Sequence, residues 1–367
     1  MSQPSEKSAF DRPHIVCVIA DDGKVADGVR DHANRLAEHL RDHDIDADVV
    51  AIPWAGNTFA SRLRALRDSI RGAPDCVVLH YSHLAWSRLG LPFGFLALVA
   101  WFRLRGPVTL WLHDPGLVGQ HRLRYRAGSA LKGCGLHLAV RVAGTGVVTV
   151  NPVALSWVTS SLANRVVLCP SPSNVGGKNR VPPVDLYTVA CFGQGIGNAR
   201  HEREPLTRVA EALVDRIGPF RLRLLGASDE APASLLADLG RLGVTCDVPG
   251  FLPPDDLRDR LAASHAFLMV RSGLTTRSGT LGAALACGLP VVGMRGPETA
   301  PPLTDAGVIA VADGDWHAMA DALTTLARDR ALQEELSRRS QAVAREHYSW
   351  DVVCARLLRL VGVASKA

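Results

Sequence analysis

The chain has 367 residues, a formal net charge of +5 and a mean hydropathy of +0.09. This length accommodates two domains of ordinary size, each able to bury its own core. Basic residues are scattered along the chain and aromatic residues make up only 5% of it, which argues against nucleic acid as a partner. The modest basic excess suits an anionic substrate.

The cysteines and the apolar segments indicate the cellular compartment in which we expect the protein. The eight cysteines stand singly, without C-x-x-C spacing, so we expect reduced thiols in a cytoplasmic protein rather than disulfides or zinc ligands. The first seven residues lack an apolar signal core. The most apolar run, residues 91–102, is too short to cross a bilayer, which takes about 20 residues. Peripheral contact with a membrane and assembly into a homodimer are left open.

Short apolar runs alternate with amphipathic segments along the chain. In the first half we expect strands at 14–20, 46–52, 75–80, 108–113, 147–150 and 166–169, and helices at 28–42, 59–71, 89–103 and after the basic residues 122–126. A segment rich in Pro, Ser and Gly, 170–186, is the predicted linker. Beyond it we expect strands at 187–192, 221–225, 244–248, 266–270, 291–292 and 308–311, and helices at 204–217, 232–242, 255–263, 316–328, 331–347 and 350–363. This alternation predicts an α/β protein with two Rossmann-like, doubly wound domains.

A polar loop that opens a helix follows the strand at 266–270. Ser278 or Thr280 can cap the helix, and Gly288 ends it. The unpaired N–H groups and the positive dipole end at this helix start favour an anion. Arg271 and Arg277 flank the same place. The alternative is an ordinary loop–helix turn with solvated arginines.

The run Ala284-Leu-Ala-Cys-Gly-Leu-Pro-Val-Val292 resembles the donor-site signature of retaining glycosyltransferases of the GT-B fold, family 4. In that family two acidic residues, eight positions apart, precede the run. Thr275 and Ala283 stand at those two positions here. The resemblance therefore implies a donor site whose ribose and sugar contacts differ from the family's, with Thr275 as a candidate catalytic residue that keeps only a neutral hydroxyl.

The resemblance also implies a domain plan and an activity. Residues 1–172 would form the acceptor domain and 185–347 the nucleotide-sugar donor domain across a central cleft, with a helix in 348–367 packing back on the first domain. The expected activity is transfer of a sugar from a nucleotide-sugar donor to a small-molecule acceptor, with retention and without metal or cofactor, for instance in bacterial specialised metabolism. The alternatives are a catalytically degenerate binding subunit and a membrane-surface transferase acting on a lipid-linked acceptor.

Ligands of open α/β sheets bind at the carboxyl ends of strands, and histidines stand at two such ends in the first half. His113 and Asp114 end one predicted strand and resemble the family's catalytic pair, whose histidine lies near the transferred sugar. His80 and His83 follow another strand and, with Gly28, are the candidates for binding the acceptor. The spacing of the two histidines would suit a metal, but no third ligand is evident.

A glycine-rich turn follows the first strand of the second half. Its glycines allow backbone N–H groups to approach a phosphate, although Gln194 replaces an arginine of the family. The alternative, a dinucleotide-binding fingerprint, has its third glycine one place early. The candidate residues for binding the donor are Gly193, Gln194, Gly195, Arg200, Gly250, Phe251, Arg271, Thr276, Arg277, Ser278, Gly279 and Thr280.

Overall fold

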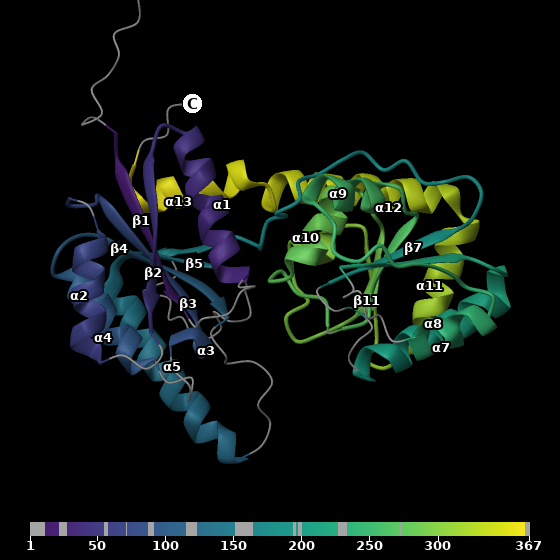
Figure 1. Ribbon diagram of the computed structural model, residues 1–367, viewed down its shortest axis with the longest axis horizontal. Helices are drawn as coiled ribbons and strands as arrows, with labels where there is room; N and C mark the ends of the chain where they lie inside the picture. The colour runs from purple at the N-terminus through teal and green to yellow at the C-terminus, as the bar shows by residue number, and fades with distance from the viewer. Residues whose placement is uncertain are drawn as a thin grey trace, which may run out of the picture. The chain divides into compact units, whose positions relative to one another are not determined.

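The computed structural model describes residues 12–21, 28–54, 58–70, 72–86, 92–114, 123–150, 164–193, 196, 200–226, 233–271 and 273–363. The chain forms two compact units (Figure 1). One comprises Met1–Cys169 with Trp350–Ala367, and the other comprises Pro170–Ser349. Each unit contains a six-stranded sheet whose neighbouring strands all run parallel. The predicted α/β class with two doubly wound sheets is therefore confirmed.

In the first unit the strand order is β2-β1-β3-β4-β5-β6. The strands are β1 His14–Asp21, β2 Asp46–Pro53, β3 Cys76–Ser82, β4 Val108–Asp114, β5 Gly144–Thr149 and β6 Val166–Leu168. The helices are α1 Gly28–Asp42, α2 Phe59–Ser69, α3 His83–Trp86, α4 Phe93–Arg103, α5 Leu123–Ala143 and α13 Trp350–Val361. Because helices cover both faces of the sheet, β1 and β3 are apolar runs that are buried along nearly their whole length.

The last helix of the chain belongs to the first unit. In Figure 1 α13 (yellow) lies beside α1 (purple), and the two helices are in contact. Val353 and Leu357 of α13 are fully buried, as is Leu36 of α1. All three belong to one apolar cluster with the strands beneath them. The amphipathic pattern of each helix therefore supplies one side of this shared core.

In the second unit the strand order is β12-β11-β10-β7-β8-β9. The strands are β7 Thr188–Phe192, β8 Arg221–Leu225, β9 Thr245–Asp247, β10 Ala266–Met269, β11 Val291–Met294 and β12 Val308–Val311. The helices are α7 Arg200–Ile217, α8 Ala233–Arg241, α9 Pro254–Ala262, α10 Gly279–Ala286, α11 Trp316–Arg328 and α12 Arg330–His347. Helix α10 is hydrophobic on all sides and its residues 281–285 are buried, so it packs close to its neighbours.

Both sheets reverse their strand order at one place. The chain lays down β1 and β2 outward and then returns to the other side of β1 with β3. Likewise it lays down β7, β8 and β9 and then returns to the other side of β7 with β10. Loops diverge at such a reversal and leave room for a ligand at the carboxyl ends of the strands. The structure therefore directs attention to the ends of β1 and β3 and of β7 and β10.

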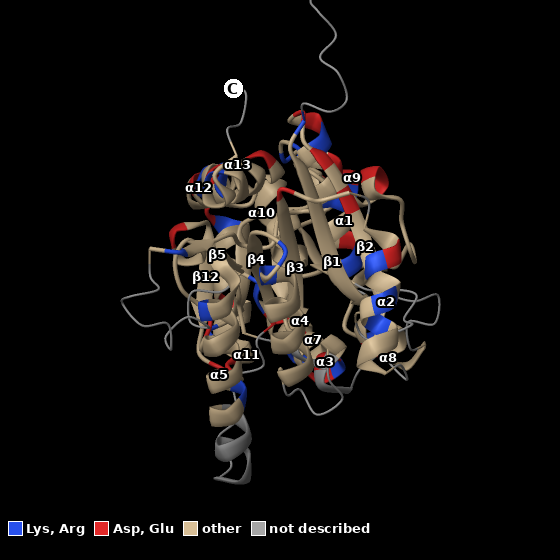
Figure 2. Ribbon diagram, turned by 90° about the vertical axis from the view of Figure 1, so that its left-hand side faces the viewer, with Lys and Arg blue, Asp and Glu red and all other residues tan. Residues whose placement is uncertain are grey.

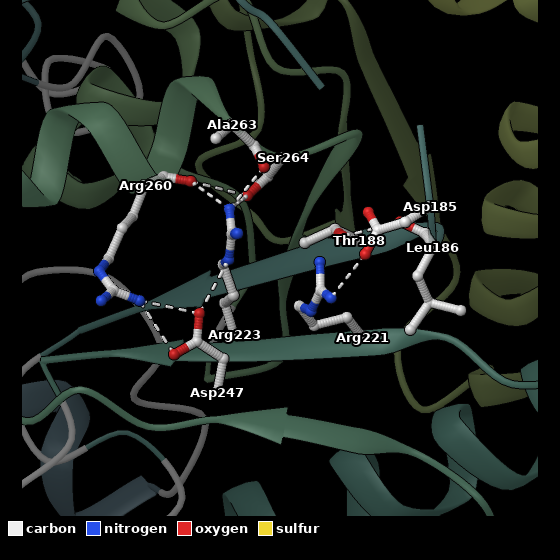
Figure 3. A network of polar contacts seen from close by, with 9 residues as sticks. All are labelled: Asp185, Leu186, Thr188, Arg221, Arg223, Asp247, Arg260, Ala263 and Ser264. Carbon is white, nitrogen blue, oxygen red and sulfur yellow. Dashed lines mark hydrogen bonds and ion pairs between the residues drawn. The ribbon is translucent and has the colours of Figure 1, made fainter. Parts of the chain in front are cut away.

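A polar network ties β8 and β9 to α9 in the second unit (Figure 3). Asp247 accepts hydrogen bonds from Arg223 Nε at 3.0 Å and from Arg260 Nη1 at 2.9 Å. Arg223 also donates to the carbonyl of Arg260 at 2.9 Å and to the hydroxyl of Ser264 at 3.2 Å. These contacts balance the charge of Asp247 and give the carbonyl of Arg260, near the end of α9, a hydrogen-bond donor. The network therefore joins the edge of the sheet to the helix that covers it.

The surface mixes charges of both signs, as Figure 2 shows on α9 and α12. All eight cysteines are free thiols, and Cys134 is exposed whereas most of the others are buried. Burial raises the pKa of the Cys287 thiol to about 11, which keeps it protonated at neutral pH. Across the part of the chain that the structure describes, no helix combines the length and the apolar character needed to span a membrane.

Candidate functional site

A cavity of about 300 Å³ lies in the second unit at the point where its strand order reverses. The residues after β7 form one wall, and the end of β10 with the loop that follows forms the other. The lining residues are Phe192, Gly193, Ile196, Leu268, Met269, Val270, Arg271, Thr275, Arg277, Ser278 and Thr280. The cavity thus combines an apolar floor with arginine and hydroxyl side chains, as small-molecule sites do.

The start of α10 forms the polar end of this cavity. Ser278 is the N-cap, because its hydroxyl accepts a hydrogen bond from the N–H of Leu281 at 3.2 Å. The hydroxyls of Ser278 and Thr280 lie 2.8 Å apart. The predicted cap is therefore confirmed at the first of its two candidates. The helix N-terminus places a partial positive charge beside the cavity.

The loop between β10 and α10 is held by the loop that follows β11. Leu274 donates its N–H to the carbonyl of Met294 at 2.8 Å, and Thr299 donates its hydroxyl to the carbonyl of Leu274 at 2.7 Å. The backbones approach so closely that a Cβ on Gly273 would meet the Cα of Gly296 at 2.5 Å. Only glycine fits there. This close packing brings the acidic side chain that lies between Gly296 and Thr299 next to the wall of the cavity.

That acidic residue is Glu298, which is only 6% exposed. Its Oε2 accepts a hydrogen bond from the hydroxyl of Thr275 at 2.8 Å and forms an ion pair with Arg277 Nε at 2.8 Å. Thr275 in turn accepts the N–H of Arg277 at 3.2 Å. Three groups from two loops are therefore locked into one network at the edge of the cavity.

Arg271 is held in the same way from another side. Its Nε forms an ion pair with Glu202, a residue of the first turn of α7 that is 1% exposed. The guanidinium lies against Gly193, where an added Cβ would meet Nη1 at 3.4 Å. Each cavity arginine is therefore backed by a buried glutamate. The two pairs are formally neutral, and they orient the planar guanidinium groups.

The first unit contains a buried histidine cluster at the carboxyl ends of β3 and β4. His80 Nδ1 and His113 Nε2 lie 2.9 Å apart, and the two rings are stacked. Pairing between β3 and β4 skips one residue here, because Tyr81 pairs with Leu112 and Ser82 pairs with Asp114. His113 is the residue left over, so this irregularity helps to direct its ring toward His80.

Burial controls the charge of this cluster. Loss of solvent lowers the pKa of His113 to about 3, although the nearby Asp114 carboxylate opposes the effect. Burial, and then the proximity of His113, lowers the pKa of His80 well below its usual value. Both imidazoles are thus neutral at physiological pH, and one donates its N–H to the other.

His32 of α1 completes the cluster. Its ring packs edge-on against those of Trp111 and His113, each with centroids 4.8 Å away, and lies 5.0 Å from that of Trp350 in α13. Burial lowers the pKa of His32 well below its usual value. Its Nε2 is buried without a hydrogen-bond partner, as is Nε2 of His80.

The structure thus brings part of the predicted donor site together. Five of those candidates line the cavity, together with the candidate catalytic residue Thr275: Gly193, Arg271, Arg277, Ser278 and Thr280. Gly279 begins α10 between two of them. Thr276 is fully buried and is not among the residues that line this cavity, and its carbonyl accepts the N–H of Ser171.

Other predicted residues lie elsewhere or are not described. Gly250 and the 89%-exposed Phe251 form the turn after β9 and do not line the cavity. His80 is fully buried, so its side chain has no exposed surface, and its Nδ1 lies 2.9 Å from Nε2 of His113. Gly28 begins α1 and is exposed. Gln194 and Gly195 lie outside the described residues, and the side chains of Arg200 and His83 do as well.

The sequence interpretation missed Glu202, Glu298 and His32. Glu298 follows a buried parallel strand, which is the position where functional side chains gather. That signal was present in the sequence and could have identified it. No comparable pattern marks Glu202 or His32. Within the described ranges, no group of three or more His, Cys, Asp or Glu side chains could hold a metal ion.

Comparison with known proteins places this geometry in context. Residues 189–329 match the family described as Glycosyl transferases group 1. The sequence has no match among curated proteins. Three similar solved structures all cover nearly the whole chain. Sucrose-phosphate synthase of Thermosynechococcus elongatus is 15% identical, with a TM-score of 0.68 over 95% of this chain and 98% of that one. A glycosyltransferase of Rickettsia africae is 13% identical, with a TM-score of 0.67 over 96% of this chain and 98% of that one. Anabaena HepE in complex with UDP and glucose is 16% identical, with a TM-score of 0.61 over 95% of this chain and 99% of that one. The chain therefore has the GT-B fold of two Rossmann-like domains, and the part of its second unit that contains the cavity is similar to that family.

Proposed function

We propose that this protein transfers a sugar from a nucleoside diphosphate sugar to a small-molecule acceptor. One observation carries the proposal: the cavity at the strand-order reversal presents two oriented arginines and a helix N-terminus, and it lies inside the segment that matches the glycosyltransferase family. UDP is the first nucleotide to test, because the similar HepE structure contains UDP and glucose.

The cavity suits the departure of a diphosphate. In the transfer, the bond between the anomeric carbon and a diphosphate oxygen breaks while the acceptor oxygen bonds to that carbon. The acceptor proton passes to the diphosphate or to solvent. Arg271, Arg277 and the start of α10 would stabilise the negative charge that develops on the leaving group. Because the two glutamates already orient the guanidinium groups, little reorganisation accompanies the reaction.

The histidine cluster belongs to the proposal as a candidate for binding the acceptor. His113 is neutral, so it can hydrogen-bond an acceptor hydroxyl without adding positive charge. Retention of the anomeric configuration forms part of the proposal, and the resemblance of residues 284–292 to the signature of retaining enzymes supports it. No resident cofactor is invoked.

The test is nucleotide binding measured by calorimetry, with UDP, GDP, ADP, CMP and dTDP, on wild type and on Arg277→Ala. We expect one nucleotide to bind and Arg277→Ala to weaken it about 10- to 100-fold, the range for loss of a hydrogen bond to a charged group. Arg330→Ala is the control, because Arg330 is also paired with a glutamate but is 90% exposed on α12. The Arg330→Ala variant should bind the nucleotide with the affinity of wild type.

A second readout separates an enzyme from a binding subunit. With the matching nucleoside diphosphate sugar, the enzyme should release nucleoside diphosphate faster when acceptors are added. Nucleotide binding without any such release would favour the degenerate subunit. If no nucleotide binds, or if Arg277→Ala binds as tightly as wild type, the proposed function is wrong.

A further inference from the structure

A cavity of about 530 Å³ lies in the first unit, between the last turn of α2 and the last turn of α4 (Figure 1). Pro74 and Pro107, which precede β3 and β4, line it, so it lies at the amino-terminal edge of the sheet. His113 stands near the other end of β4, about 20 Å away at the rise of an extended strand. The cavity therefore belongs neither to the histidine cluster nor to the cavity of the second unit.

Apolar side chains form most of the wall of this cavity. They come from the two helices and from the starts of the two strands: Ile70, Pro74, Val77, Trp101, Phe102 and Pro107. Val77 and Phe102 are buried, whereas the side chain of Trp101 is only partly covered. Free energy is gained when an apolar group replaces the water over such a wall. The cavity thus suits a ligand with an apolar body.

Two arginines complete the lining, and none of the lining residues that the structure describes is acidic. They are Arg67 of α2 and Arg105, which follows α4. The guanidinium of Arg105 lies over the indole of Trp101, with its Cζ 3.9 Å from the ring centroid, and its Nη1 donates to the carbonyl of Trp101 at 2.7 Å. These contacts hold the guanidinium at the cavity and use only one of its five N–H donors.

The positive charge at this cavity is not balanced by the protein. Within the described part of the chain, no carboxylate forms an ion pair with Arg67 or Arg105. Arg271 and Arg277 at the cavity of the second unit differ in this respect, because each is paired with a buried glutamate. Arg67 and Arg105 therefore leave room for an anionic group from outside the chain, and guanidinium groups match phosphate and carboxylate geometry.

We propose that this cavity binds an amphipathic anion. The apolar chain or ring of the ligand fills the space between α2 and α4, and Arg67 and Arg105 hold its phosphate or carboxylate group. Leu104, 86% exposed beside Arg105, extends the apolar surface past the cavity. A free amphiphile and the headgroup of a membrane lipid both offer this chemistry. The inference does not depend on the proposed function.

The test is calorimetric titration of the full chain with octyl phosphate below its critical micelle concentration. The reference ligands are 1-octanol, which has the chain without the charge, and inorganic phosphate, which has the charge without the chain. We expect octyl phosphate to bind at least about 10-fold more tightly than either, because burial of methylene groups and bonds to arginine both contribute. Arg67→Gln and Arg105→Gln should each weaken octyl phosphate about 10-fold and leave 1-octanol unchanged.

Two further variants test the position of the site. Arg64→Gln is the matched control, because Arg64 is also an exposed arginine of α2 but does not line the cavity; this variant should bind octyl phosphate as wild type does. Ala73→Phe places a ring at an exposed lining position, so it should weaken octyl phosphate and 1-octanol alike, each about 10-fold. All four substituted positions are exposed, so melting temperatures without ligand should equal that of wild type. If Ala73→Phe melts lower, the two arginine variants decide.

The inference is overturned if octyl phosphate binds no more tightly than the reference ligands, or if neither Arg67→Gln nor Arg105→Gln weakens it. It also fails if Arg64→Gln weakens octyl phosphate equally, since the binding is then general attraction to a basic surface. Sedimentation with phosphatidylglycerol vesicles distinguishes the two sources of ligand. Sedimentation of wild type that Arg105→Gln abolishes assigns a lipid headgroup, and any other result assigns a free amphiphile. Arg105→Gln should bind nucleotide as wild type does, so failure of this inference leaves the proposed function intact, and the reverse also holds.

Discussion

The buried histidine cluster predicts that the first unit loses stability in mild acid. The pKa of His113 is about 3 in the folded protein, against about 6.5 for an unfolded histidine. Between these values the unfolded chain binds a proton that the folded chain does not, so the free energy of unfolding falls as pH falls. Integrated from pH 7.5 to 5.0, this linkage amounts to about 2 kcal/mol for His113 alone.

The assay is urea unfolding of the full chain at pH 7.5 and 5.0, followed by tryptophan fluorescence. Six of the seven tryptophans lie in the first unit, so the signal reports mainly on that unit. His113→Asn removes the titrating ring and keeps a group able to hydrogen-bond His80. We expect wild type to lose about 2 kcal/mol more than this variant between the two pH values.

A control variant separates the titration of His113 from general effects of acid on stability. His317 is exposed at the start of α11 in the second unit, and His317→Asn should show the pH dependence of wild type. If His113→Asn and wild type lose equal stability between pH 7.5 and 5.0, His113 is not held neutral by burial. The account of the cluster as a pair of uncharged imidazoles would then be refuted.

Two further predictions concern the second unit and are measured by denaturant unfolding. Asp247→Ala should lower the free energy of unfolding by about 2–3 kcal/mol, because it leaves the largely buried Arg223 without its counter-charge. The loss should be smaller than for a fully buried ion pair, because Asp247 is 26% exposed. An unchanged denaturation midpoint would show that the network does not stabilise the fold. Gly307→Ala should cost about 3 kcal/mol or prevent folding, since its Cβ would lie 1.9 Å from the carbonyl oxygen of Leu336. Gly240 lies at an exposed helical position in α8, where an added Cβ would meet no atom within 4 Å. Gly240→Ala should therefore stabilise the protein by about 0.5–1 kcal/mol. A loss of stability in both glycine variants would contradict the steric explanation.

Much of the fold was predictable because it depends on local patterns. Strands such as β1 are short apolar runs between polar turns, and α1 was predicted with its observed bounds from its apolar face. Ser278 was a predictable cap because its type and its place before a helix suffice to identify it. Such features need only neighbouring residues, so they can be read directly from the sequence.

The contacts within the site were less predictable because they join residues far apart in the chain. Arg271 is paired with Glu202, 69 positions away, and this contact depends on β7 and β10 being neighbours in the sheet. His80 posed a different problem. A parallel strand covered on both faces has no polar side, so periodicity could not show that His80 is fully buried.

The buried glutamates also change how the replaced motif residues should be interpreted. Judged by sequence position, Thr275 and Ala283 suggest a donor site that has lost its acids. In the structure, however, Ala283 is packed in the core of α10, while a carboxylate from the loop after β11 stands directly behind Thr275. An acidic charge near the cavity is therefore present, but it comes from another segment and accepts a hydrogen bond from the Thr275 hydroxyl. A motif scored residue by residue cannot register such a relocation, because the two loops meet only after β10 and β11 have paired.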